Sequence, residues 1–81
     1  MALTRDIHSM PAFVAEALAA RGLRSAFDAR PPYQQNDWTG WIAGAKREDT
    51  QQRRLEKMLS ELAAGHGYMG MEWHPKPNKE D

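Results

Sequence analysis

The clearest helical pattern in the chain covers residues 48–64, where five apolar side chains share one face at about 100° per residue. They are Leu55, Met58, Leu59, Leu62 and Ala63. Glu48 and Asp49 fall in the first turn, where carboxylates suit the positive end of the helix dipole, and Gly65 follows as a C-terminal cap would. The pattern predicts an amphipathic helix with one buried face.

A similar pattern precedes it, since Trp38, Trp41, Ile42 and Ala45 recur at i, i+3, i+4 and i+7. Pro32 can open this helix, which we expect to run from Tyr33 to Ala45. The two tryptophans could stack on bases or another flat ligand. A core position fits them better, because a domain this small has few other large apolar side chains.

Two shorter helices are predicted in the first part of the chain. The first begins at Pro11, and its buried stripe is Phe13, Val14, Ala17 and Leu18. Gly22 ends it as a left-handed cap, and Leu23 is expected to fold back onto Leu18. The second covers about residues 24–29, buries Ala26 and Phe27, and stops at Pro31 and Pro32.

The fold class that follows is all-α, a small single-domain bundle of about four helices with an irregular C-terminal tail. We divide the chain into a flexible N-terminal segment (residues 1–9), a helical domain (10–65) and an extended tail (66–81). Tyr68, Met69, Met71 and Trp73 are more apolar than a solvated tail requires. They either pack across a groove between helices or form an exposed segment for a partner, with Tyr68 and Trp73 as secondary partner contacts.

Composition narrows the function classes. Eleven basic and eleven acidic residues give the 81-residue chain a formal net charge of zero, which argues against a globally basic nucleic-acid binder. The absence of cysteine excludes disulfides, thiol catalysis and Cys-based zinc sites. No apolar run reaches the ~20 residues of a membrane span, and the N-terminus lacks the apolar core of a signal peptide. We therefore expect a cytoplasmic protein.

An ordered set of short motifs carries a family resemblance. The motifs are Pro31-Pro32, Asp37-Trp38, Trp41-Ile42, Ala45-Lys46-Arg47, Asp49-Thr50 and Arg53-Arg54-Leu55. From about residue 10 to 65 the chain resembles the bacteriocin-protection, YdeI or OmpD-associated proteins of bacteria. It departs from their pattern at Gln51, where an arginine is common, and at Tyr33, Gly40 and Gly44. The resemblance implies a helical module linked to stress or bacteriocin resistance, and it implies no reaction.

No constellation of catalytic or metal-binding residues stands out. His8, His66 and His74 do not pair at i, i+4 on a helix, and a usable site needs convergent ligands. The serines and threonines have no spacing to a histidine and an acid that recommends one as a nucleophile. We therefore predict no catalytic residues, no metal, no cofactor and no enzymatic activity.

One candidate binding surface remains, formed by Lys46, Arg47, Arg53, Arg54 and Lys57. Helical periodicity turns Arg53 and Lys57 away from the apolar stripe of residues 48–64, with Arg54 on its flank. Like charges at i, i+4 repel, so stability alone does not favour this pair. An ordinary solvated face, diluted by nearby carboxylates, fits the same residues.

The sequence thus predicts a non-catalytic interaction module that binds a protein partner. The alternative is binding of nucleic acid or another anionic ligand through the basic face. The sequence does not indicate an oligomeric state.

Overall fold

A computed structural model describes residues 9–74, which form four helices and a turn after the last of them. We call this turn, residues 66–74, the closing turn. The helices are α1 (Ala12–Arg21), α2 (Arg24–Asp28), α3 (Pro32–Ala43) and α4 (Glu48–Ala64). Within this part of the chain there is no strand beyond one isolated bridge, between Tyr68 and Met71. The all-α prediction is confirmed. Predictions for residues 1–8, including His8, and for residues 75–81 lie outside the described residues.

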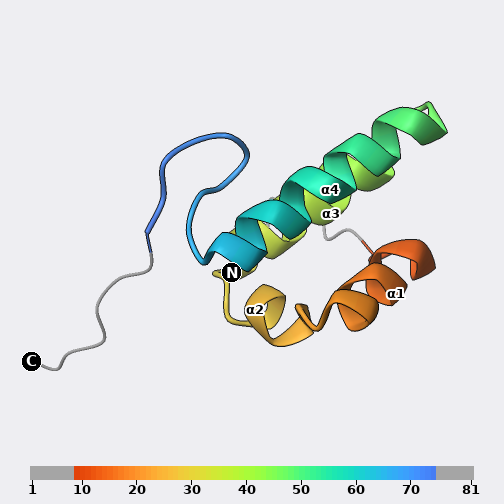
Figure 1. The fold of residues 1–81 in the computed structure, drawn as a ribbon. Coiled ribbons are helices and arrows are strands. Elements are labelled where there is room, and N and C mark those ends of the chain that lie inside the picture. The colour runs from red at the N-terminus through yellow and green to blue at the C-terminus, as the bar shows by residue number, and fades with distance from the viewer. Residues whose placement is uncertain (1–8, 75–81) are drawn as a thin grey trace, which may run out of the picture.

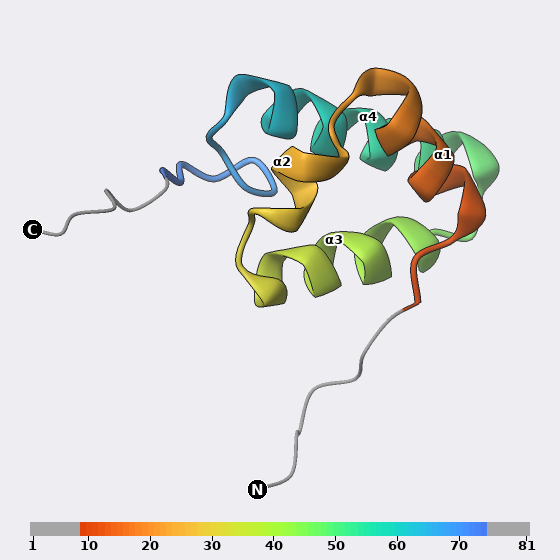
Figure 2. The ribbon, with the colours of Figure 1, turned by 90° about the horizontal axis from the view of Figure 1, so that it is seen from below.

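The helices are arranged around the long pair α3 and α4, which lie along one another (Figure 1). α1 and α2 cross one side of this pair, and Figure 2 views the molecule from that side. The segment after α4 turns back beside α2. Among residues 9–74, no helix is long and apolar enough to cross a bilayer.

The α1 C-terminus shows how local sequence signals set this topology. Gly22 has φ of 68°, and its N–H donates to the Ala19 carbonyl at 3.2 Å. The Leu23 N–H donates to the Leu18 carbonyl at 2.8 Å. These two bonds form a Schellman motif, in which the left-handed residue is most often glycine. The predicted cap at Gly22 and the return of Leu23 to Leu18 are confirmed.

The core lies between α1, α2 and the α3–α4 pair. Its fully buried apolar side chains are Val14, Leu18, Trp38, Ile42, Met58 and Leu59. Trp38 is central, with its ring 6.4 Å from that of Phe27 and 5.4 Å from that of Tyr68. The predicted stripes are confirmed at most positions, but Ala63 is exposed and Trp41 is only half-buried.

The third helix ends two residues earlier than predicted, at Ala43. Gly44 turns tightly, and its N–H donates to the Gly40 carbonyl at 2.8 Å. A Cβ on Gly44 would lie only 2.9 Å from that carbonyl oxygen, so a larger residue does not fit without a shift. Ala45 is buried as predicted, although it lies outside the helix.

Residues 66–74 differ from the extended tail predicted for this segment, because they fold into a tight turn against the bundle. Tyr68 and Met71 exchange backbone hydrogen bonds of 2.9 and 2.8 Å, and Gly67 donates to the Trp73 carbonyl at 2.7 Å. Tyr68 is only 8% exposed, and its hydroxyl donates to Asp37 at 2.6 Å. Of the two alternatives for the apolar tail residues, the packed one is correct for Tyr68 and Trp73.

Candidate functional site

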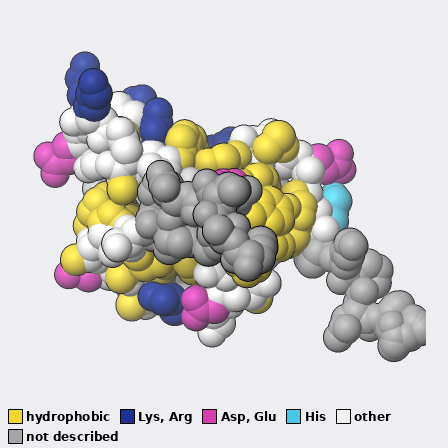
Figure 3. All heavy atoms as spheres, turned by 180° about the vertical axis from the view of Figure 1, so that it is seen from behind, with side chains coloured by type: hydrophobic (Ala, Val, Ile, Leu, Met, Phe, Trp, Pro, Cys, Tyr) yellow, Lys and Arg dark blue, Asp and Glu magenta, His cyan; other side chains and the backbone are white. Residues whose placement is uncertain are grey.

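The five basic residues predicted as a binding surface have different surroundings. Arg47 forms an ion pair with Asp49 at 3.1 Å, and Lys46 is exposed in the connection between α3 and α4. Figure 3 shows one face, with apolar side chains over much of it and Lys and Arg side chains projecting at the end where that connection lies. Basic character is therefore local in a chain of zero net charge.

Arg54 links the two long helices. Its Nη1 donates to the Trp41 carbonyl at 2.7 Å, and its guanidinium lies 5.1 Å from the centre of the Trp41 ring. The last carbonyls of a helix have no partner within the helix, and Trp41 lies in the last turn of α3. Arg54 satisfies one of these carbonyls, so it holds the end of α3 against α4 in addition to contributing positive charge.

Arg53, Arg54 and Lys57 converge on an open groove of about 420 Å³ between α3, α4 and the closing turn. The remaining lining residues are Trp41, Thr50 and Met69. None of the six is acidic. Within the described part of the chain, Arg53 makes one weak hydrogen bond, from Nη2 to the Thr50 hydroxyl at 3.5 Å. Among residues 9–74, no carboxylate forms an ion pair with Arg53 or Lys57. We call these six residues the basic groove.

Met69, in the closing turn, supplies part of the apolar lining of the basic groove. Met69 has φ of 52°, a left-handed conformation, and Gly70 follows with φ of 83°. Glu61 of α4 holds both residues, since its carboxylate accepts the Met69 N–H at 2.9 Å and the Gly70 N–H at 2.8 Å. The sequence analysis gives Glu61 no role and leaves Met69 between packing and partner contact, because the two residues meet only when the chain folds back.

Arg30 anchors the same turn from the other side. This side chain is 6% exposed, and it donates to the carbonyls of Gly67 and Glu61 at 2.8 and 3.2 Å. Its guanidinium lies between two tryptophan rings, 4.9 Å from Trp38 and 4.4 Å from Trp73. Burial lowers the pKa of Arg30, and the nearby Glu61 carboxylate opposes that shift. No sequence pattern pointed to Arg30. Its contacts place Trp73, like Tyr68, within the packed turn.

The two described histidines lie close together without forming a metal site. The rings of His66 and His74 stack at 5.2 Å, and His74 lies 3.3 Å from the Glu72 carboxylate. No group of three or more histidine, cysteine or acidic side chains in the described part of the chain could hold a metal ion.

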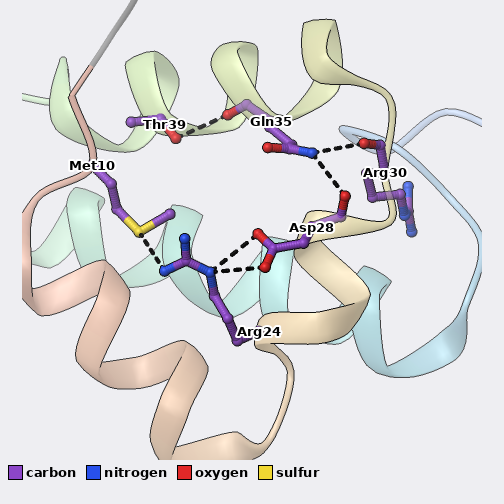
Figure 4. Close-up of polar contacts among 6 residues, drawn as sticks. All are labelled: Met10, Arg24, Asp28, Arg30, Gln35 and Thr39. Carbon is purple, nitrogen blue, oxygen red and sulfur yellow. Dashed lines mark hydrogen bonds and ion pairs between the residues drawn. The ribbon is translucent and has the colours of Figure 1, made fainter.

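A second groove lies between α2, α3 and Met10, which precedes α1, and polar side chains around it have hydrogen-bond partners (Figure 4). Arg24 donates to Asp28 at 3.1 Å and contacts the Met10 sulfur at 3.8 Å. The Gln35 amide donates to the backbone carbonyls of Asp28 and Arg30 at 3.1 and 2.8 Å, which satisfies the end of α2. These side chains have structural partners, so the basic groove is the better candidate site.

Comparison with known proteins identifies a family. The model of the bacteriocin-protection, YdeI or OmpD-associated family matches residues 8–65, which is more than half of the chain. No curated protein and no solved structure matches this chain. The motif resemblance and the family match cover nearly the same residues, and the chain therefore belongs to the bacteriocin-protection, YdeI or OmpD-associated family.

Proposed function

We propose that this chain is a non-catalytic interaction module that binds an acidic segment of a protein partner in the basic groove. One observation carries the proposal. Arg53 and Lys57 stand at the rim of a groove lined by six residues, and neither forms an ion pair with a carboxylate of residues 9–74. Their charge is thus available to a ligand.

The chemistry of the rim favours carboxylates. An arginine guanidinium can grip a carboxylate with two parallel hydrogen bonds, and a lysine ammonium adds a flexible point charge. Arg53 and Lys57 are exposed and one helical turn apart. An anion between them relieves their mutual repulsion. Exposed charges of this kind contribute more to association rate and specificity than to the stability of the fold.

A protein segment fits the groove better than nucleic acid does. Single-stranded nucleic acid is usually held by bases stacked on open aromatic rings. The only aromatic ring lining the basic groove is that of Trp41, and the Arg54 guanidinium already lies over it at 5.1 Å. A zero net charge also provides no extended basic track for a phosphate backbone.

The family supplies the setting for this proposal. Its name connects its members with bacteriocin protection and with association with another protein. A module that captures an acidic segment could serve such a role by holding a partner, with no reaction required. The family name thus supports our proposal of a role in bacterial stress or bacteriocin resistance.

Selection from a displayed random-peptide library tests the proposal directly. The wild-type protein should enrich peptides rich in aspartate and glutamate, and Arg53→Glu with Lys57→Glu should abolish that enrichment. The matched control is Lys46→Glu with Arg47→Glu, which changes the net charge equally but lies outside the basic groove. Recovery of acidic peptides by the groove variant would contradict the proposal. The proposal would also be contradicted if the wild-type protein bound a mixed-sequence DNA oligonucleotide more tightly than the selected acidic peptides, in a salt-sensitive manner.

A further inference from the structure

Met69 occupies a backbone position that its side chain disfavours. It is the first of two central residues in the turn closed by Tyr68 and Met71, and both central residues have positive φ. Positive φ at both positions is the signature of a type I′ turn, where asparagine, aspartate and glycine are strongly preferred. Met69 is also the only described non-glycine residue with positive φ. Turn geometry alone does not account for a methionine here.

The surrounding contacts hold Met69 in this conformation. The Glu61 carboxylate accepts the N–H groups of Met69 and Gly70, and Tyr68 is buried in the core. A strained residue persists when its surroundings fix it in this way, and such residues cluster at ligand-binding sites. These contacts therefore fix the backbone of the turn and the position of the Met69 side chain.

In this position the Met69 side chain lines the basic groove. Its side chain and Trp41 supply the apolar lining, next to the charges of Arg53 and Lys57. Lys57 lies close to this turn, since a Cβ at Gly70 would be in ordinary van der Waals contact, at 3.7 Å, with both Cε and Nζ of Lys57. An apolar lining beside basic side chains is complementary to a ligand that carries both an apolar group and negative charge.

We propose that Met69 is an apolar anchor of the binding site, so that the partner segment carries an apolar side chain flanked by carboxylates. This inference rests on the function proposed above and narrows its ligand. Methionine suits the task, because its unbranched, polarizable thioether adapts to different apolar side chains. Met69 is half-buried and packs against the core, and we assign the part of its side chain that lines the basic groove to recognition.

Fluorescence anisotropy with two dye-labelled peptides tests the inference. One peptide has a leucine between two pairs of glutamates, and the other has a serine in place of the leucine. Met69→Asn keeps a residue that accepts positive φ while removing the apolar side chain. It should weaken binding of the leucine peptide about fivefold and change binding of the serine peptide less than twofold. Met71→Asn is the matched control, because Met71 is exposed, lies in the same turn and does not line the basic groove.

The outcomes separate this inference from the proposed function. If Arg53→Glu with Lys57→Glu abolishes binding of both peptides while Met69→Asn changes neither, the groove binds anions but Met69 is not an anchor. A melting temperature of Met69→Asn more than about 8 °C below wild type would show that Met69 serves the fold, which also overturns the inference. An equal loss of leucine-peptide binding in Met71→Asn would do the same. If the charge-reversed protein binds both peptides normally, the proposed function itself is wrong.

Discussion

Removal of the Arg30 side chain should be among the most damaging single changes in this protein. Arg30→Ala deletes hydrogen bonds to the Gln34 side chain and to the carbonyls of Gly67 and Glu61, at 3.0, 2.8 and 3.2 Å. It also removes the cation from between the rings of Trp38 and Trp73. The closing turn then loses its link to the segment between α2 and α3.

The expected cost follows from these contacts. Hydrogen bonds to a charged group contribute roughly 1.5–3 kcal/mol each, and cation–π contacts about 0.5–2 kcal/mol. These contributions are not additive, and the variant also avoids the cost of desolvating the guanidinium, which offsets part of the loss. We expect a net loss of about 3 kcal/mol. A chain of 81 residues has a total stability of only about 4–12 kcal/mol. The melting temperature should therefore fall by roughly 12–24 °C.

Urea denaturation followed by circular dichroism measures this loss. Arg30→Lys keeps the charge but not the planar fork, so it should recover less than half of the lost stability. Arg24→Ala is the control, because this exposed arginine makes a surface ion pair with Asp28 that is worth about 1 kcal/mol or less. The reasoning is refuted if Arg30→Ala and Arg24→Ala unfold at the same urea concentration.

Three further predictions concern the core, the turn and the groove. Leu59→Ala should lower the free energy of unfolding by about 2–5 kcal/mol, because Leu59 is 1% exposed; Ala63→Ser, on the exposed side, should cost under about 0.5 kcal/mol in the same urea titration. Glu61→Ala should speed hydrogen exchange at the Met69 and Gly70 amides, which lose their acceptor, and unchanged exchange would contradict that role. Arg53→Gln with Lys57→Gln should change stability by about 1 kcal/mol or less; a larger loss by thermal melting would mean that these residues support the fold.

The helices were predictable because their signals are local. Caps at Gly22 and Gly65 require only a left-handed residue after an apolar turn, and both glycines have positive φ. Ala63 was misplaced because its exposure depends on whether another element covers that side of α4. Periodicity alone cannot report such coverage. Periodicity also does not mark the end of α3 at Ala43, after which the Ala45 N–H donates to the Ile42 carbonyl at 3.3 Å.

The candidate site was only partly predictable, for a related reason. Periodicity turned Arg53 and Lys57 away from the core, and the structure places both at the rim of the basic groove. Part of the apolar lining comes from Met69, whose turn lacks the usual Asn-Gly or Asp-Gly signal. Arg30 is buried because the closing turn folds over it, and that contact joins residues 37 positions apart. No local pattern encodes such a pairing.

The central claim is that the basic groove binds an acidic protein segment, and a nuclear magnetic resonance titration tests it most directly. The amide and indole signals of ¹⁵N-labelled protein are followed as the glutamate peptide with the central leucine is added. The account predicts saturable shifts that map to Trp41, Arg53, Lys57 and Met69. Shifts confined to the groove around Phe27 and Gln35, or no saturable shifts at all, would contradict it.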